Sequence, residues 1–235
     1  LLGAEVIKIE NLKQGDWTRV GGKDQSLTNL FMGTSFLIQN SDKKSIQIDL
    51  KSDKGKKIAL KLIKNVDVFV ENMRPGKADK LGLGWKEVSN INNKIIYCSI
   101  SAFGQDGPFK NRGAYDHVVQ GMSGIMTTTG TEETGPTKVG SPFIDYSTGM
   151  SAAFAILSAI HEVKQKQKSI RLDVSMLDTS FLLMANMVTE HLNSGWIPTP
   201  MGNEAQSGSP ASGMYSTLTS PILLAANNNT QFSSL

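Results

Sequence analysis

One acidic residue, Asp145, stands where a catalytic carboxylate could act. It lies in the segment 140–150, between a short apolar approach and a stretch that carries Phe154 and Leu157 at helical spacing. An aspartate at such a place most often caps the first turn of a helix. A carboxylate at the positive end of a helix could instead serve as a nucleophile without a partner base, because a reference pKa of about 3.9 leaves it ionised at neutral pH. The residue types alone favour the cap.

Two other features could bind an anionic ligand. Eight lysines lie within residues 43–64, and on composition alone they are typical of a solvated helix face. Lys51, however, follows a strand-like run and precedes a helix-like one, which is where ligands gather in open α/β sheets. Polar, glycine-containing turns also follow two strand-like runs, at 70–76 and 101–108. Such turns could line one crevice, although ordinary turn chemistry explains each of them equally well.

Several classes of site and partner lack support. No GxGxxG follows a strand-like run and no GxxxxGK[ST] occurs, so the usual dinucleotide and P-loop phosphate sites are not indicated. The three histidines lie far apart, without HExxH or cysteine partners, and we expect no metal site. Cys98 lies in an apolar run, as expected for a buried, unreactive thiol. The net charge of +3 and the lack of an apolar run near 18 residues predict neither a nucleic-acid nor a membrane partner. A single cysteine fits a reducing compartment, and we expect a cytoplasmic location.

Elements of two kinds must position these residues. Strand-like runs occur at 5–10, 45–50, 66–71, 95–101 and 169–175, and helix-like stretches at 53–65, 76–90, 114–126, 146–164 and 176–193. This alternation predicts an α/β protein with a largely parallel sheet covered by helices. We expect a large domain over 1–194 and a Gly-, Pro- and Ser-rich linker over 195–213. A hairpin over 214–226 would then open a smaller second domain within 214–235.

Six segments follow one another in a set order: 2–10 with Gly15-Asp16; 40–51; 67–72 with 74–76; 104–108; 114–116 with 120–124; and Asp145 with Gly149-Met150. In their order and spacing, these segments resemble the family III CoA-transferases of the CaiB/BaiF type, which include formyl-CoA and carnitine CoA-transferases. The resemblance implies a Rossmann-like large domain with a largely parallel sheet and flanking helices. It also overrides the preference for a helix cap at Asp145.

The resemblance implies that Asp145 is the nucleophile and passes through covalent aspartyl intermediates, with Tyr115 and Asp116 in supporting roles. Coenzyme A would be a substrate and product, and no permanently bound cofactor is expected. Lys80 stands in place of a family arginine near phosphate, which keeps the charge but loses the bidentate geometry. The implied CoA-binding residues are Ile48, Lys51, Asn72, Met73 and Lys80, and the implied oxyanion-binding loop carries Gly202, Gly208 and Gly213.

The function that follows is transfer of coenzyme A from an acyl-CoA donor to a small carboxylic acid. A racemase of the α-methylacyl-CoA type is an alternative, but that branch has a histidine where this chain has Tyr115, and a phenol is a poor base at neutral pH. His117 lies two residues further on and is expected to point elsewhere. A non-catalytic CoA-binding or structural module is a third hypothesis.

Both ends of the sequence, Leu1 and Leu235, lie next to strand-like runs rather than in polar termini. We therefore expect the chain to be a fragment of a longer protein and, by itself, to be inactive. The resemblance implies that the full-length protein forms a homodimer of interlocked subunits.

Overall fold

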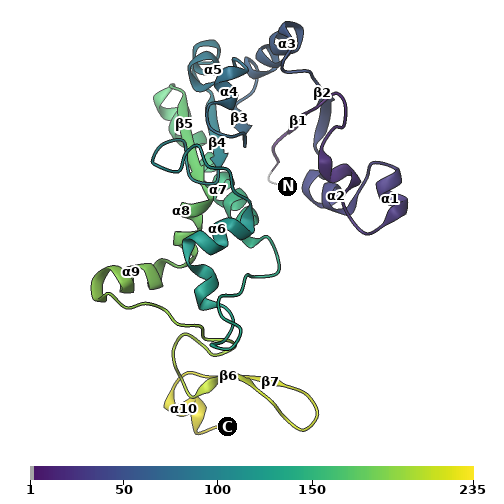
Figure 1. The fold of residues 1–235 in the computed structure, drawn as a ribbon. Helices are drawn as coiled ribbons and strands as arrows, with labels where there is room; N and C mark the ends of the chain where they lie inside the picture. Colours follow the sequence, from purple (N-terminus) through teal and green to yellow (C-terminus); the bar gives the residue numbers. More distant parts are fainter. Residues whose placement is uncertain (1–2) are drawn as a thin grey trace. The chain divides into compact units, whose positions relative to one another are not determined.

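A computed structural model describes residues 3–235, so Leu1 and Leu2, the latter the first residue of the predicted motif, lie outside the described part of the chain. The chain divides into two compact units (Figure 1). Unit 1 holds the described chain up to Phe69, together with Gly76–Tyr97 and Gln165–Ile170. Unit 2 holds Val70–Pro75, Cys98–Lys164 and Arg171–Leu235.

Unit 1 begins with a parallel strand pair. Ile7 of β1 lies opposite Lys44 of β2, and Glu10 lies opposite Gln47. Parallel strands need a crossover connection, and three short helices that were not expected from the sequence lie along it. The elements are β1 (Ile7–Glu10), η1 (Trp17–Val20), α1 (Gln25–Asn29), α2 (Thr34–Asn40) and β2 (Lys44–Gln47).

The core of unit 1 lies under α3. The Ser52 hydroxyl caps this helix by accepting a hydrogen bond from Gly55 N at 3.0 Å, and one face of the helix buries Ala59 and Ile63. The helix predicted over 76–90 is two short helices instead, because Gly82 adopts a left-handed φ of +67° between them. The elements are α3 (Asp53–Ile63), α4 (Lys77–Lys80) and α5 (Trp85–Ile91), and the fully buried core residues are Ala59, Ile63, Leu83, Val88, Ile95 and Tyr97.

A second sheet has the strand order β3-β4-β5, with bounds Val68–Glu71, Ile96–Ser101 and Ile170–Ser175. At the start of the strands, Ile96 N donates to Asp67 O and Ile170 N to Ile95 O, each at 3.0 Å. The strands therefore begin side by side and run parallel. The predicted α/β class with parallel strands and flanking helices is confirmed. Most strands begin within one or two residues of the predicted position.

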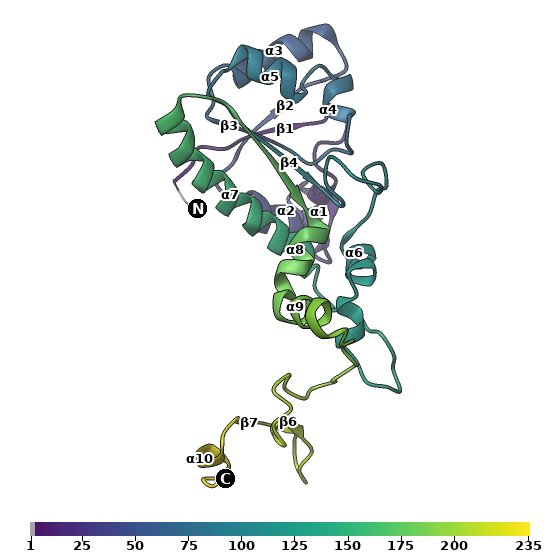
Figure 2. The same cartoon turned by 90° about the vertical axis from the view of Figure 1, so that its left-hand side faces the viewer.

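Most of the longest helix of the described chain, α7 (Phe143–Lys166), belongs to unit 2. Figure 2 shows that the chain reverses after α7, returns as β5 and passes directly into α8. Buried Val119, Ile144 and Met176 bring α6, α7 and α8 into one small core. The single helix predicted over 176–193 is interrupted at Met184, where ψ is 22°. The elements are α6 (Asp116–Ser123), η2 (Ile125–Thr128), α7 (Phe143–Lys166), α8 (Met176–Leu183) and α9 (Ala185–Ser194).

Helix α7 is longer than the sequence indicated, because it begins at Phe143 rather than near residue 146. By length and composition alone it could cross a membrane, and the sequence expectation of no such run was wrong on this point. A core helix of a soluble protein passes the same test, so a single such helix is weak evidence for a membrane partner.

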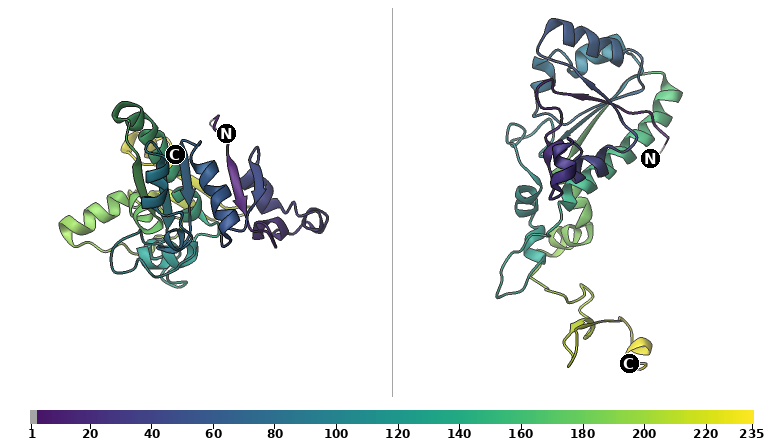
Figure 3. Two further views of the ribbon diagram at one scale, coloured as in Figure 1. Left: turned by 90° about the horizontal axis from the view of Figure 1, so that it is seen from above. Right: turned by 90° about the vertical axis from the view of Figure 1, so that its right-hand side faces the viewer.

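The described chain ends with a hairpin. Strands β6 (Ala211–Tyr215) and β7 (Ile222–Ala226) are antiparallel, with Ala211 opposite Ala226, and α10 (Asn229–Phe232) follows. Figure 3 shows this segment in yellow. The predicted hairpin is confirmed, but β6 begins three residues earlier than expected, so residues 211–213 belong to a strand and not to a linker.

Candidate active site

The first turn of α7 carries Asp145 and is capped by a side chain from another helix. Asp116, the first residue of α6, is 7% exposed. Its Oδ2 atom accepts hydrogen bonds from Ile144 N at 2.8 Å and Asp145 N at 3.1 Å. The first amides of a helix have no partner within the helix, so Asp116 serves as the N-terminal cap of α7. Asp145 itself is not the cap.

A residue without an assigned role in the sequence analysis, Gln120, completes this arrangement. It lies one turn after Asp116 on α6 and is fully buried. Its Nε2 donates to Asp116 Oδ1 at 2.5 Å, and its Oε1 accepts from Val139 N at 2.9 Å. The i, i+4 spacing of Asp116 and Gln120 on one helix was the available signal.

The electrostatics of Asp145 differ from the simple expectation for a helix end. The pKa of Asp145 is raised, first by desolvation and second by the negative charge of Asp116. Both effects disfavour the charged carboxylate and oppose the favourable field of the helix N-terminus. Asp145 is an exposed residue, so a ligand can reach its side chain.

Tyr115 occupies the N-cap position of α6 in an extended conformation and is 77% exposed. The expectation that His117 points elsewhere was wrong. The rings of Tyr115 and His117 stack, with centroids 6.4 Å apart and planes at 10°. Two residues at positions i and i+2 point to different sides when both are helical. Tyr115 lies before the first turn of α6 in an extended conformation, so its ring can lie beside that of His117.

The predicted oxyanion-binding glycines lie in three settings. Gly202 has a φ of +56° and its amide donates to Gly130 O at 2.6 Å, and Gly208 has a φ of +64°. Gly213 lies in β6 opposite Leu224 and so is not a loop residue. Within residues 3–235, no hydrogen bond joins these glycines to Asp145.

Three of the predicted CoA-binding residues belong to unit 1. Ile48 directly follows β2, is 5% exposed, and its amide donates to Glu10 O at 3.0 Å. Lys51 is exposed at the start of α3, and its amide donates to Asp49 Oδ1 at 3.0 Å. Lys80 is the last residue of α4 and is also exposed. Lys51 and Lys80 thus present their ammonium groups to solvent, and Ile48 belongs to the core beneath the strand end.

The other two, Asn72 and Met73, belong to unit 2 and follow β3. Asn72 is exposed, and Met73 N donates to the buried Glu71 carboxylate at 2.9 Å. After β4, the second polar turn is held in a similar way, because Gln105 N donates to Asp173 Oδ2 at 2.7 Å. A carboxylate therefore fixes the backbone of both polar turns, the one after β3 and the one after β4.

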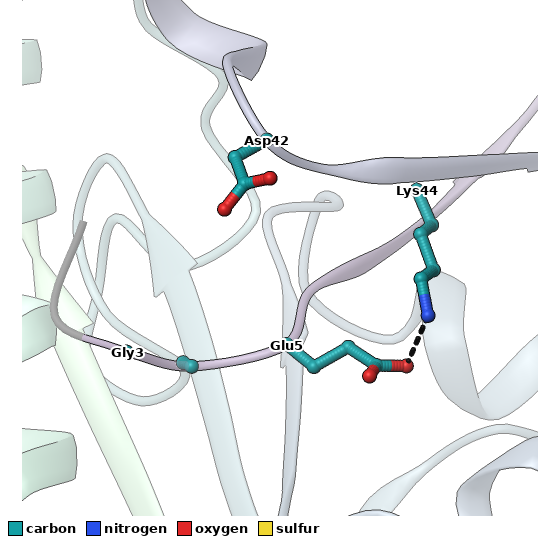
Figure 4. Close-up of a pocket in the computed structure, with 5 residues that line it drawn as sticks. Gly3, Glu5, Asp42 and Lys44 are labelled. Carbon is teal, nitrogen blue, oxygen red and sulfur yellow. Dashed lines mark hydrogen bonds and ion pairs between the residues drawn. The ribbon is translucent and has the colours of Figure 1, made fainter.

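Other features carry less chemistry. Cys98 is fully buried, and burial, followed by the charges of Glu71 and Asp173, raises the pKa of its thiol to about 11. No group of three potential metal ligands occurs among the described residues. A hollow of about 430 Å³ in unit 1 is lined by Gly3, Ala4, Glu5, Asp42 and Lys44. Lys44 Nζ lies 2.9 Å from Glu5 Oε1, and Figure 4 shows this contact. None of the predicted site residues lines the hollow.

Comparison with known proteins places these residues in a family. The family model for CoA-transferase family III matches residues 2–235. The chain belongs to CoA-transferase family III. Succinate–glutarate CoA-transferase of Agrobacterium fabrum is 34% identical to this family III chain over 234 residues, which are 98% of this chain and 58% of that protein. Succinyl-CoA:glutarate CoA-transferase of Homo sapiens is 35% identical over 237 residues, covering all of this chain and 52% of that protein.

A solved structure gives the same result. The crystal structure of a CaiB/BaiF family protein from Brucella suis has a TM-score of 0.87 with this family III chain and is 34% identical to it. The match covers 99% of this chain and 61% of that one. The chain thus spans a little over half the length of the curated relatives it matches.

Proposed function

We propose that the full-length protein transfers coenzyme A from an acyl-CoA thioester to a small carboxylic acid, with Asp145 as the nucleophile. Membership of CoA-transferase family III supports the reaction class. The observation that carries the residue assignment is the cap at α7, where Asp116 binds the first-turn amides and leaves the exposed Asp145 carboxylate free of them. Relatives are named for succinate, glutarate and oxalate, which makes a dicarboxylic acid our first choice of acceptor.

The proposed reaction begins with attack of an Asp145 carboxylate oxygen on the thioester carbonyl. The C–S bond breaks, CoA leaves as its thiolate, and a mixed anhydride joins Asp145 to the donor acyl group. The thiolate then attacks the aspartyl carbonyl of the anhydride, which releases the donor as a carboxylate and leaves an aspartyl-CoA thioester. Covalent catalysis of this kind replaces one difficult exchange by steps of similar energy.

The acceptor carboxylate next attacks the aspartyl-CoA thioester and expels the CoA thiolate, forming a second anhydride. Attack of the thiolate on the acceptor carbonyl then gives the new acyl-CoA and restores the Asp145 carboxylate. No net proton is taken up or lost. Each tetrahedral intermediate carries an oxyanion, and the family resemblance assigns its stabilisation to the loop that carries Gly202 and Gly208.

The remaining site assignments rest on the family resemblance. Lys51 and Lys80 supply positive charge for the CoA phosphates, Met73 supplies an apolar contact, and Asn72 supplies an amide beside the nucleotide. Ile48 is buried and supports the end of β2 that precedes Lys51. Tyr115 and Asp116 support the nucleophile. We further infer a cytoplasmic homodimer for the full-length protein, which light scattering would detect as twice the subunit mass.

The test is to incubate the full-length protein with succinyl-CoA or acetyl-CoA in the absence of acceptor and to quench with hydroxylamine. Both the anhydride and the aspartyl thioester yield a hydroxamate at Asp145, which peptide mass spectrometry locates. An unmodified Asp145 peptide under conditions of active CoA transfer would overturn the assignment. Deuterium exchange at the donor α-carbon without any acceptor would instead indicate the racemase.

A further inference from the structure

The carboxylate of Asp116 is held on both sides. Its Oδ2 accepts the two amides of the α7 first turn, and its Oδ1 accepts Gln120 Nε2 at 2.5 Å. Asp116 is 7% exposed and Gln120 is fully buried, so water is largely excluded from these contacts. The strength of such contacts depends on the donors and acceptors matching, because an unmatched buried polar group is costly.

The orientation of the Gln120 amide is determined by a third contact. Val139 N, a backbone donor that cannot reverse its role, donates to Gln120 Oε1 at 2.9 Å, and Val139 O lies 3.5 Å from Nε2. Turning the amide over would place Nε2 against the Val139 N–H and Oε1 against the Asp116 carboxylate. Gln120 therefore presents a donor, and not an acceptor, to the Asp116 carboxylate.

The cap has a consequence for Asp145. The first-turn amides of a helix lack partners within the helix and attract a nearby side-chain acceptor, most often an N-cap residue. Here Asp116 occupies the amides of Ile144 and Asp145. As long as Asp116 stays in place, the Asp145 carboxylate is directed to other partners, such as a thioester carbonyl.

We propose that Gln120 is a positioning residue for the reaction: it holds the Asp116 carboxylate turned toward α7, and so keeps Asp145 available as the nucleophile. This inference rests on the proposed function. Gln120 does not touch the substrate in this account and acts only through Asp116.

The test is Gln120→Glu in the full-length protein, compared over a range of pH. One oxygen of the new carboxylate can still accept from Val139 N, but the other faces Asp116 Oδ1. Two carboxylates this close resist ionising together, so at low pH the pair shares one proton and keeps the geometry. As the pH rises, the proton is lost and repulsion turns Asp116 away from α7. The charged or titratable side chains at the start of α6, in the first turn of α7, on α8 and next to Val139 are Tyr115, His117, Asp145, Tyr146, Asp178 and Lys138.

We expect the kcat of Gln120→Glu to fall by about tenfold to a hundredfold as the pH rises to about 8. The wild type should not show this fall, and the KM for acyl-CoA should change little. Gln39→Glu is the matched control, because Gln39 is an exposed residue of α2 and the chemical change is the same. Its pH profile should follow the wild type.

A double variant separates positioning from folding. Asp116→Asn combined with Gln120→Glu reverses each donor and acceptor between the two side chains while keeping the net charge of the pair. An amide oxygen at position 116 can accept the α7 amides, and its nitrogen can donate to the new carboxylate. The double variant should recover kcat at about pH 8 to within about tenfold of the wild type, well above either single variant.

The outcomes distinguish the two proposals. An active wild type whose pH profile is unchanged by Gln120→Glu would overturn the role of Gln120 and leave CoA transfer in place. A double variant no better than the single ones at any pH would also overturn it. A wild type that transfers no CoA from any acyl-CoA tested would overturn the proposed function, and that result appears before any substitution is made.

Discussion

Two buried carboxylates, Glu10 in unit 1 and Asp116 in unit 2, are exposed to a similar extent, at 5% and 7%, but their partners differ. Glu10 accepts Arg19 Nε at 2.8 Å and Arg19 Nη2 at 2.7 Å, and also bonds Ser45 and the Asp16 amide. Asp116 accepts only neutral donors, and among the described residues it forms no ion pair. Its charge acts on another carboxylate, that of Asp145.

The two carboxylates act on different neighbours. A carboxylate with a cation partner and several hydrogen bonds is stabilised in its charged form, and the pKa of Glu10 is lowered to about 2. Asp116 has no such cation partner and contributes, after desolvation, to the raised pKa of Asp145. The first arrangement holds the β1–η1 turn together, and the second is the one to which we assign a role in the proposed reaction.

The largest expected effect is at Asp145. Asp145→Asn should lower kcat by about a thousandfold or more, because the amide is a far weaker nucleophile than the carboxylate. Asp178→Asn is the control, since Asp178 is also an exposed aspartate in the first turn of a helix. Steady-state CoA transfer measures both. Equal activity losses in the two variants would contradict a special role for Asp145.

The comparison of the two buried carboxylates is tested directly by replacing each with its amide. Glu10→Gln should lower the free energy of unfolding by about 2 kcal/mol, because the Arg19 guanidinium loses its charged partner, while kcat per folded molecule is retained. Asp116→Asn should lower kcat by about tenfold to a hundredfold with a smaller loss of stability. Urea unfolding measures the stability of both variants, and steady-state kinetics measure their kcat. A loss of kcat mainly in Glu10→Gln and a loss of stability mainly in Asp116→Asn would contradict the distinction between the two carboxylates.

Acid should expose the Glu10 ion pair. The pKa of Glu10 is lowered from 4.5 to about 2 in the folded chain. The stabilisation is therefore complete above the unfolded value and is lost as the pH falls from about 4.5 toward 2. The free energy of unfolding of the wild type, measured with a chemical denaturant, should therefore fall as the pH is lowered over this range. Glu10→Gln should make this free energy less dependent on pH. The same pH dependence in the variant and the wild type would show that Glu10 does not cause it.

The smallest effects are expected at the N-cap of α3 and at an exposed ion pair. Ser52→Ala removes the hydroxyl that accepts Gly55 N at the start of α3 and should cost about 1 kcal/mol of stability. Glu5→Gln is a useful reference, because Glu5 and Lys44 form an ion pair that is about two-thirds exposed and should contribute less than about 1 kcal/mol. In thermal unfolding, Ser52→Ala should lower the melting temperature more than Glu5→Gln does. A larger fall for Glu5→Gln would contradict this prediction.

Local features of the fold could be predicted from the sequence. Ser52 and the apolar positions of α3 lie within one helix, and the parallel strands appear as short apolar runs separated by helical ones. The helices η1, α1 and α2 were missed because each is seven residues or shorter and too brief to show a period. The split between α4 and α5 depends on the conformation of Gly82, which a helical pattern does not reveal.

The site was predictable only in part. Asp145 and Asp116 could be named from the resemblance, but which of them caps α7 depends on a contact between residues 29 positions apart. Gln120 had a visible i, i+4 relation to Asp116, yet its role follows from Val139, another non-local contact. The stacking of Tyr115 on His117 depends on where α6 begins, and helix ends are the least certain feature of a sequence-based prediction.

The most direct test of the central claim follows an oxygen atom. When the acceptor acid carries oxygen-18 in its carboxylate, its attack on the aspartyl-CoA thioester places a labelled oxygen in the anhydride bridge. Attack of the CoA thiolate on the acceptor carbonyl then leaves that oxygen on Asp145. We predict oxygen-18 in the Asp145 side chain of the full-length protein after turnover, found by peptide mass spectrometry and absent from Asp178. Efficient CoA transfer with no label at Asp145 would contradict the account.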